Sequence, residues 1–486
     1  MLRFELQTVL RETKGRWLDA GQPPRLLATG ISTDSRSLAP GDLFFALEGD
    51  RDGHVFVRQA IEKGATACVV RKERSGLSSG PLIAVDDPLE ALENVALWHR
   101  RSLSAGVTAI TGSMGKTTTK EFLRALLAVR YRVVAAPKSF NNRLGVALTL
   151  FAADRATEQL VLEMGTSGSG EIAHLSKLVK PDRAMITMIA PAHLSGLKDL
   201  DGVIAAKAEI LDGLTRDGVF YANADLPRID EVVRRAPGLV RTYGWGKGDF
   251  AIRRCSQDAL GTAAGAGLPR RSTYVFEVQG EELRLPVFGR HNVLNATAAV
   301  AVARDLGLSW EEIREGLGAC RAPPQRMQIA DEGSVLFLDD SYNANPGSMA
   351  SAIDAWEELP VDDGQRVAIL GDMLELGKES RRFHESVGRR LASVRIDLLV
   401  TVGSDSRFLA DAFDEEARQR ATLPSPETCH FEDVGEAGHF LKNRLRPGDQ
   451  VLVKGSNLSG VNCLAGDLRR WARGAMGAAG ARGTAG

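Results

Sequence analysis

The side chains best suited to chemistry lie in Gly112-Ser113-Met114-Gly115-Lys116-Thr117-Thr118, directly after a β-branched run at 107–111. A strand, a glycine turn and a helix start together present backbone N–H groups and a helix N-terminus to a phosphate. In such a loop Lys116 reaches the β- and γ-phosphates, and the hydroxyl of Thr117 holds Mg²⁺. The common form of the loop has a further glycine where Ile110 stands, and a bare glycine turn can be only a turn. The Gly-Lys-Thr-Thr run after a strand nevertheless favours nucleoside triphosphate binding.

A carboxylate and an imidazole are expected close to this loop. Glu163 ends the strand-like run 159–163, and His193 follows the strand-like run 184–189. Both therefore fall at the carboxyl ends of strands, where sites of α/β proteins lie. A carboxylate and a neutral imidazole beside a triphosphate suit a divalent cation. A capping glutamate and a surface histidine are the alternatives, but the phosphate loop favours the metal interpretation.

Three further side chains lie on predicted helices. Lys207 belongs to an amphipathic helix, where a lysine is ordinarily exposed to solvent. Asn292 and Asn295 stand near the start of an alanine-rich helix at 296–303. Their position favours helix capping, although their amides could also bond the edge of a purine.

The C-terminal part of the chain offers polar groups at strand ends. The segment Asp339-Asp340-Ser341-Tyr342-Asn343-Ala344-Asn345-Pro346 follows a strand and introduces a helix, with Pro346 as its first residue. Such a loop displays side chains, and local Asx turns are the alternative. Arg326, just after Pro323-Pro324, could reach a phosphate across an interdomain cleft or form a surface ion pair. Lys454 ends the strand-like run 451–453.

Elements that could position these groups divide the 486 residues into about three domains. Alternating strands and helices after residue 100 indicate parallel sheets covered by helices. We predict an α/β fold with a small mixed α/β N-terminal domain (1–88), a central P-loop parallel-sheet ATPase domain (89–322) and a C-terminal Rossmann-like α/β domain (323–473). A Gly/Ala/Arg-rich loop at about 258–272 is expected to be exposed, and a tail at 474–486 to be disordered.

Composition excludes several other classes of protein. Hydrophobic residues make up 44% and charged residues 25%, and the net charge is −1, so no strong field attracts nucleic acid or an anionic membrane. The five cysteines include no C-x-x-C pair, which fits a reduced compartment and argues against a structural zinc site or a disulfide framework. The first residues, Met-Leu-Arg-Phe-Glu-Leu-Gln, do not have the pattern expected of a signal peptide, and no run approaches 18 apolar residues. We expect a cytoplasmic protein without nucleic acid partners or membrane insertion.

The phosphate loop and several other motifs resemble those of the Mur ligases, the ATP-dependent amide-forming enzymes of peptidoglycan precursor synthesis. The resemblance covers about residues 30 to 460. Its N-terminal part, which is similar to a nucleotide-sugar-binding domain, rests on Asp34-Ser35-Arg36, Pro40-Gly41-Asp42-Leu43-Phe44 and Asp52-Gly53-His54. Three motifs resemble the branch that adds D-alanyl-D-alanine: Ser139-Phe140-Asn141-Asn142, Asp339 to Pro346, and Leu370-Gly371-Asp372-Met373-Leu374-Glu375-Leu376-Gly377.

This resemblance implies roles for the residues that match the family's motifs. Lys116 and Thr117 would hold ATP and Mg²⁺, with Glu163 and His193 completing the metal environment, and Lys207 would react with CO₂ to give a metal-binding carbamate. Asn292 and Asn295 would face the adenine, and Arg326 and Asp340 would complete the ATP site when the C-terminal domain closes. The implied partners are UDP-N-acetylmuramoyl-tripeptide and D-alanyl-D-alanine, bound by a monomer. Substrate-binding roles are expected for Ser35, Arg36, Asn141, Asn142, Tyr342, Asn343, Asn345 and Lys454.

Four places depart from the family's usual pattern. Thr166-Ser167-Gly168 stands where Ala-Asn-His is usual, Met188 where asparagine is, Ser195 where an acid is and Asn457 where arginine is. These departures leave ATP chemistry intact but keep two alternatives open. The chain could be a related ligase with another acceptor, or an idle paralogue that binds the precursor and regulates the pathway.

Overall fold

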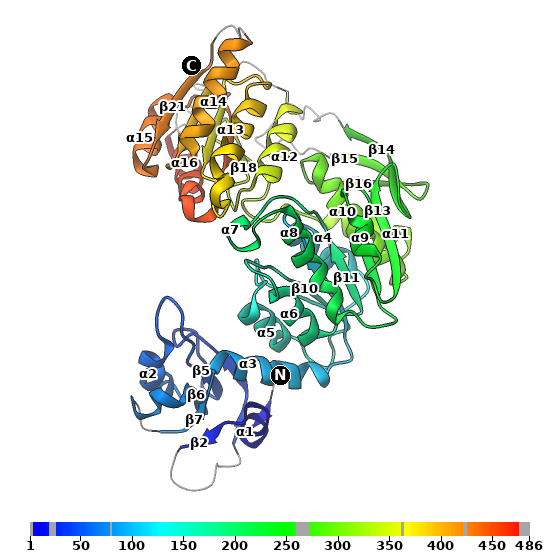
Figure 1. The fold of residues 1–486 in the computed structure, drawn as a ribbon, viewed down its shortest axis with the longest axis vertical. Coiled ribbons are helices and arrows are strands. Elements are labelled where there is room, and N and C mark those ends of the chain that lie inside the picture. The colour runs from blue at the N-terminus through cyan, green and yellow to red at the C-terminus, as the bar shows by residue number, and fades with distance from the viewer. Residues whose placement is uncertain are drawn as a thin grey trace, which may run out of the picture.

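The computed structural model describes residues 3–18, 26–77, 80–258, 273–360, 364–420 and 425–475. Figure 1 shows three bodies that follow one another along the chain, from the blue N-terminal body through the cyan and green central body to the yellow-to-red C-terminal body. Each body is built around a β-sheet of its own. The predicted α/β fold with several parallel-sheet domains is confirmed.

The N-terminal body holds a five-stranded sheet in the order β2-β7-β6-β5-β4, in which β2 alone is antiparallel to its neighbour. Helix α3 (Pro88–Arg101) leads from this body to the central one, as Figure 1 shows. It begins where it does because the Asp87 carboxylate accepts the N–H groups of Leu89 and Glu90, and Pro88 suits the first turn. The other elements are β1 (Phe4–Glu5), α1 (Leu6–Thr13), β2 (Arg16–Trp17), β3 (Leu27–Ala28), β4 (Gly30–Ser32), β5 (Asp42–Phe45), η1 (Gly53–Phe56), α2 (Val57–Glu62), β6 (Ala67–Arg71), η2 (Lys72–Leu77) and β7 (Leu82–Val85).

The central body contains a nine-stranded sheet in the order β16-β15-β14-β13-β12-β11-β8-β10-β9. Strands β8 to β14 are parallel to their neighbours, whereas β15 and β16 pair antiparallel at one edge. The elements are β8 (Gly106–Thr111), α4 (Lys116–Leu127), β9 (Val133–Ala135), α5 (Arg143–Ala152), β10 (Gln159–Glu163), α6 (Glu171–Val179), β11 (Arg183–Ile186), α7 (Leu194–Leu197), α8 (Leu200–Ala208), η3 (Glu209–Gly213), β12 (Val219–Asn223), α9 (Ile229–Val233), β13 (Leu239–Trp245), β14 (Phe250–Asp258), β15 (Thr273–Val278), β16 (Glu281–Leu285), α10 (Arg290–Asp305) and α11 (Trp310–Ala319).

The parallel sheet expected from the sequence is confirmed for β8 to β14, and an antiparallel hairpin extends it at one edge. The strands β15 and β16 form a hairpin whose polar and apolar residues alternate, as suits a sheet with one solvated face. Most of the loop expected at 258–272 lies outside the described residues.

Helix α10 packs closely on α4, the helix that follows the phosphate loop, because its inner positions are small. Ala296, Ala299 and Ala303 are all fully buried. Small side chains allow two helix backbones to approach without voids. The close approach places Asn295 beside Gly115, where an added Cβ would lie 2.6 Å from the Asn295 Oδ1.

The C-terminal body has a six-stranded sheet in the order β17-β18-β22-β19-β20-β21, parallel except for β17. Pro346 is the first residue of α12, as predicted, and Asn345 caps that helix. The tail prediction is wrong for Gly474 and Ala475, which are helical, while 476–486 lie outside the described residues. The elements are β17 (Gln328–Glu332), β18 (Val335–Asp339), α12 (Pro346–Glu357), β19 (Arg366–Gly371), η4 (Gly377–Glu379), α13 (Ser380–Leu391), β20 (Leu398–Val402), α14 (Ser406–Gln419), β21 (Glu427–Phe431), α15 (Val434–Arg444), β22 (Gln450–Lys454), η5 (Asn457–Ser459) and α16 (Val461–Ala475).

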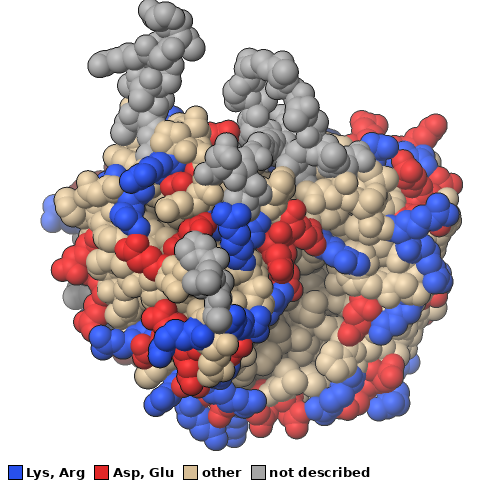
Figure 2. Space-filling model, turned by 90° about the horizontal axis from the view of Figure 1, so that it is seen from above, with Lys and Arg blue, Asp and Glu red and all other residues tan. Residues whose placement is uncertain are grey.

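The surface carries charges of both signs. Figure 2 shows Lys and Arg side chains intermingled with Asp and Glu over the face that it presents. Among the described residues, no helix combines the length and the apolar character that crossing a bilayer requires.

Candidate active site

A cavity of about 1270 Å³ is lined by residues of the central and C-terminal bodies and extends to helix α3. Most of the predicted site residues line it. They are Ser113, Met114, Gly115, Lys116, Thr117, Thr118, Asn141, Asn142, Glu163, His193, Asn292, Asn295, Arg326, Asp340, Tyr342, Asn343, Asn345 and Lys454. Gly112, Lys207, Ser35 and Arg36 are not part of the lining.

The phosphate loop joins β8 to α4 with a geometry that requires glycine. Gly112 and Gly115 have φ angles of 150° and 82°, and a Cβ on Gly112 would lie 2.1 Å from the Thr187 hydroxyl oxygen. Gly115 precedes α4 without offering a side-chain cap, so the first N–H groups of the helix have no such partner. Lys116 donates to the Gly112 carbonyl over 2.8 Å. This arrangement fits an anion such as a phosphate at the helix N-terminus.

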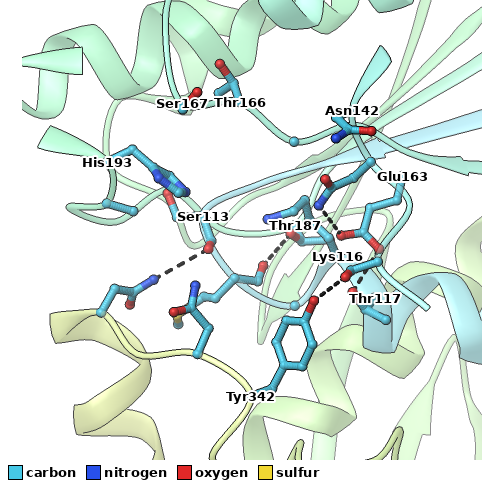
Figure 3. Close-up of a pocket in the computed structure, with 18 of the residues that line it drawn as sticks. Ser113, Lys116, Thr117, Asn142, Glu163, Thr166, Ser167, Thr187, His193 and Tyr342 are labelled. Carbon is cyan, nitrogen blue, oxygen red and sulfur yellow. Dashed lines mark hydrogen bonds between the residues drawn. The ribbon is translucent and has the colours of Figure 1, made fainter. Parts of the chain in front are cut away.

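Glu163 lies at the centre of a polar cluster beside this loop (Figure 3). The Thr117 hydroxyl donates to its Oε2 over 2.8 Å, and the Asn141 amide donates to its Oε1 over 3.1 Å. The carboxylate is almost fully buried. A hydroxyl and a carboxylate held together at a helix N-terminus are hard oxygen ligands of the kind that Mg²⁺ prefers. The residues present therefore fit a divalent cation.

Lys116, which is half-buried, and Lys207, which is buried, are two lysines whose charges repel each other. Burial lowers the pKa of Lys116, and the nearby Glu163 carboxylate partly opposes this effect. Burial, followed by repulsion from Lys116, lowers the pKa of Lys207 to about 7. The expectation of an exposed lysine at 207 is wrong, because the residue is only 1% exposed on helix α8. A lysine in this state has a large neutral, nucleophilic fraction near neutral pH.

His193 approaches the cavity from the turn before α7, with its backbone in the left-handed region at φ 54°. Burial lowers the pKa of its imidazole, which favours the neutral form that binds metals. Its Nδ1 contacts the carboxylate of Glu375, and the Ser195 N–H donates to the Glu375 carbonyl over 3.1 Å. A loop of the C-terminal body is thereby docked against the His193 turn.

The capping interpretation of Asn292 and Asn295 is wrong. The residue preceding α10 is Gly289, and neither asparagine caps the helix. Instead Asn292 donates to the Phe288 carbonyl over 2.6 Å, and Asn295 donates to the Asn292 Oδ1 over 3.1 Å. Both line the cavity beside the phosphate loop, where amides can bond a base.

An ion pair marks the C-terminal side of the cavity. Lys454 Nζ lies 2.5 Å from an Asp340 carboxylate oxygen and also donates to the Asn343 carbonyl over 3.0 Å. The backbone N–H of Met327 donates to the other Asp340 oxygen over 3.0 Å. The Asx-turn alternative also holds for part of this loop, because the Ser341 N–H donates to the Asp339 carboxylate over 3.2 Å.

Tyr342 and Asn345 connect the C-terminal body to the central one, and Arg326 packs on Tyr342. The Arg326 guanidinium lies 4.0 Å from the centre of the Tyr342 ring, and the Tyr342 hydroxyl contacts the Ser139 hydroxyl. The surface-ion-pair alternative for Arg326 finds no support, since it forms no ion pair with the described residues. The Asn345 amide spans the same boundary and donates to the Ser113 carbonyl over 3.5 Å.

The N-terminal residues expected to bind substrate lie apart from the cavity. Ser35 donates to the Gln59 side chain over 2.7 Å, and the exposed Arg36 pairs with Asp34 at 2.7 Å. Nearby His54 could belong to a metal cluster by type, but both its ring nitrogens are used: Nδ1 bonds Asp52 and Nε2 accepts the Arg71 N–H.

The prediction of site residues overlooked several groups that line the cavity. Thr187 follows β11 and donates to the Met114 carbonyl over 2.6 Å, which holds the phosphate loop. Thr187 could have been predicted, because it directly follows a strand of the sheet that also carries the phosphate loop. Glu93, Arg143 and His174 form a linked cluster on three helices, and only the adjacency of Arg143 to Asn142 could have indicated it.

Comparison with known proteins follows the same three-part division. Residues 28–96 match the model of the Mur ligase family catalytic domain, 110–303 match the Mur ligase middle domain, and 325–457 match the Mur ligase glutamate ligase domain. The chain belongs to the Mur ligase family.

Individual members of the Mur ligase family are similar over most of the chain. The UDP-N-acetylmuramoyl-tripeptide–D-alanyl-D-alanine ligase of Bacillus subtilis is 34% identical over 94% of this chain and 96% of its own length. The ligase of the same name from Escherichia coli is 35% identical over 79% of this chain and 83% of its own length.

Solved structures support the same assignment. MurF from Acinetobacter baumannii superposes with a TM-score of 0.83 at 30% identity, covering 97% of this chain and 99% of that one. MurF from Thermotoga maritima in complex with ADP gives a TM-score of 0.77 at 26% identity, covering 92% and 98%. The resemblance that the sequence motifs indicated is confirmed.

Proposed function

We propose that this Mur ligase uses ATP to join D-alanyl-D-alanine to UDP-N-acetylmuramoyl-tripeptide, which gives the pentapeptide precursor of peptidoglycan. Relatives of that activity match nearly the whole chain. The observation that carries the proposal is the cluster of Lys116, Thr117 and Glu163 at the start of α4, facing Asp340 and Lys454 of the C-terminal body across one cavity. An idle paralogue would have no need to keep this cluster.

ATP lies along α4 and α10 in this proposal. The N–H groups at the start of α4 and the Lys116 ammonium bind the β- and γ-phosphates, and Asn292 and Asn295 bond the adenine. Arg326 and Asp340 contact the nucleotide from the C-terminal side. Arg326 lies close enough to Lys116 to lower that residue's pKa, so both cations converge where phosphate charge gathers.

Thr117, Glu163, His193 and a carbamate on Lys207 would hold the Mg²⁺ of the reaction. The metal supplies charge neutralisation to the transferring phosphoryl group. Carbamate formation requires a neutral amine that attacks CO₂, and the lowered pKa of Lys207 provides one. A carbamate also replaces a buried positive charge with a negative one beside Lys116, which removes the repulsion between the two lysines.

The reaction proceeds in two substitutions. An oxygen of the terminal carboxylate of the tripeptide attacks the γ-phosphorus, ADP leaves, and an acyl phosphate forms. The amine of D-alanyl-D-alanine then attacks the acyl carbon, loses a proton, and expels inorganic phosphate. The contacts of Tyr342 with Ser139 and of Glu375 with His193 join the C-terminal body to the central body and hold the cavity closed, which protects the acyl phosphate from water.

Each of the three bodies has a different role in this proposal. The N-terminal domain (1–88), with Ser35 and Arg36, receives the UDP-sugar, and the central domain (89–322) binds ATP. The C-terminal domain (323–473) closes over both and presents Tyr342, Asn343, Asn345 and Lys454, while Asn141 and Asn142 contact substrate from the central side. We expect a monomer that acts in the cytoplasm.

An isotope experiment tests the proposed chemistry directly. Tripeptide precursor labelled with ¹⁸O in its terminal carboxylate is turned over with ATP and D-alanyl-D-alanine, and the inorganic phosphate is analysed by mass spectrometry. One ¹⁸O per phosphate is expected, because the attacking oxygen leaves with the phosphate. Unlabelled phosphate would exclude the acyl phosphate, and unlabelled precursor in ¹⁸O water is the control for hydrolysis.

A further inference from the structure

Part of the cavity, here called the recess, is lined by residues of three helices, α3, α5 and α6. Helix α3 comes from the N-terminal side, while α5 and α6 belong to the central body and lie directly against it (Figure 1). Four leucines line this recess, namely Leu89, Leu144, Leu175 and Leu178. A recess lined in this way suits a short run of methylene groups.

Arg143 stands at the rim of the recess with about three of its five guanidinium N–H donors unused by the described residues. Its Nε donates to Glu93 Oε1 over 2.9 Å, and its Nη2 contacts Glu93 Oε2. Nη1 makes no hydrogen bond with the described residues, and the side chain is 41% exposed. A guanidinium bound sideways in this manner keeps a second fork, formed by Nη1 and the outer N–H of Nη2, for another carboxylate.

Glu93 fixes the direction of that fork. Its carboxylate is buried on α3 and also accepts from His174 Nε2 over 2.9 Å. A buried carboxylate with two hydrogen-bonding partners from two other helices is held in one position. Arg143 is thereby oriented by the protein rather than by its ligand, which lowers the entropic cost of binding.

Glu90, one helical turn before Asn94 on α3, adds an opposite charge at the same rim. It lines the cavity, is exposed, and forms no side-chain hydrogen bond or ion pair with the described residues. The carboxylate is close enough to Arg143 to contribute to that residue's raised pKa, although Glu93 is the main cause. The recess therefore offers an apolar floor, one free cationic fork and one free carboxylate.

We propose that this recess receives the side chain of the third residue of the precursor peptide, and that it selects a diaminopimelate over a lysine. Both side chains carry methylenes and an amine, but only diaminopimelate ends in a carboxylate beside that amine. The Arg143 fork binds this carboxylate, Glu90 binds the amine, and the leucines cover the methylenes. The inference rests on the proposed function, because it assumes that the tripeptide precursor is the substrate.

Binding calorimetry with two precursors tests this subsite without relying on turnover. UDP-N-acetylmuramoyl-tripeptides with diaminopimelate or with lysine as the third residue are titrated into the full chain. We expect the wild type to bind the diaminopimelate form at least ~10-fold more tightly, as expected for a charge-assisted bidentate pair. Arg143→Met should remove most of this preference and leave the affinity for the lysine form nearly unchanged.

Two variants and a control make the result specific. Arg143→Lys keeps a cation beside the buried Glu93, so it protects the fold, yet it lacks the fork and should lose part of the preference. Glu90→Gln should weaken both precursors alike, since both carry the amine. Arg130→Met is the matched control, because Arg130 binds Glu312 through the same Nε and Nη2 atoms outside the cavity.

The other outcomes overturn the inference in distinguishable ways. The wild type could bind the two precursors equally, or Arg143→Met and Arg143→Lys could weaken the binding of both precursors equally. Either result would show that Arg143 does not distinguish diaminopimelate from lysine at the third position. The proposed function would survive either result. A wild type that binds neither precursor would instead overturn the proposed function, and the subsite with it.

Discussion

The Thr117 hydroxyl donates a hydrogen bond of 2.8 Å to the Glu163 carboxylate. This pair joins α4, the helix that follows the phosphate loop, to the end of strand β10. The two residues are 46 positions apart in the chain, and the parallel pairing of β8 with β10 brings them together. A cation held here would lie beside the ammonium of Lys116. The pair is therefore where metal, phosphate and lysine meet in the proposed reaction.

Replacing Glu163 should weaken the binding of the divalent cation. We expect Glu163→Gln to reduce the affinity for Mn²⁺, measured by electron paramagnetic resonance in the presence of ADP, by at least ~10-fold, because the amide lacks the charge of a metal ligand. Glu231→Gln, at an exposed surface pair, is the control. Unchanged Mn²⁺ affinity in Glu163→Gln would place the cation elsewhere.

Lys116 should be indispensable for turnover. Lys116→Ala removes a cation from the γ-phosphate position, and we expect phosphate release from ATP to fall at least ~100-fold. Lys180, exposed at the end of α6, gives the control variant Lys180→Ala. Near-normal phosphate release by Lys116→Ala would contradict the placement of the ATP site.

Lys207 should give the protein a pH-dependent stability. Its pKa is about 7 in the folded chain and near 10.5 in the unfolded one, so between these values the unfolded chain holds a proton that the folded chain lacks. The free energy of unfolding in CO₂-free buffer should therefore rise with pH from about 7 to about 10.5. Relative to Lys207→Met, the gain should be at least ~1 kcal/mol.

Denaturant unfolding at a series of pH values measures this gain. Lys177→Met, which removes an exposed lysine, should keep the wild-type slope. Identical slopes in the wild type and Lys207→Met would mean that the lysine is not buried in solution. Adding ¹³C-bicarbonate should give the wild type, but not Lys207→Met, a carbamate signal in its ¹³C spectrum.

Lys120 offers a test of how the segment around Ala136 and Lys138, just before Ser139 and Asn141, is anchored. It is completely buried on α4, and its ammonium donates to the carbonyls of Ala136 and Lys138 and lies 3.1 Å from Glu121. Lys120→Met would leave these carbonyls without their donor, so the free energy of unfolding should fall by about 2 kcal/mol. Lys180→Met is the control, and equal stability of Lys120→Met and wild type would refute the anchoring role.

The alternation of strands and helices, the phosphate loop and the helix start at Pro346 follow from local patterns in the sequence, as does the placing of Lys116 and Glu163 at a helix start and a strand end. Each is a strand end, a glycine turn or a helix start, and such signals lie within a few residues of one another. The carboxyl ends of parallel strands lie at one edge of a sheet. Identifying Glu163 as the end of a strand was therefore enough to predict that it lies near the phosphate loop.

Long-range packing could not be predicted in the same way. Lys207 occupies a helix position that looks exposed, and only the packing of α8 in the central body buries it. Asn292 and Asn295 have the residue types and position of helix caps, but the helix starts earlier, at Arg290. The Glu93–Arg143 contact joins residues 50 positions apart on two helices, and no periodic pattern in the sequence indicates it.

The most direct test of the proposed function is phosphate release from ATP by the purified protein with UDP-N-acetylmuramoyl-tripeptide, with and without D-alanyl-D-alanine. Release that requires both substrates, together with a pentapeptide product identified by mass spectrometry, is the predicted result. Tight binding of the tripeptide precursor without phosphate release, or release only with a different amine, would contradict it.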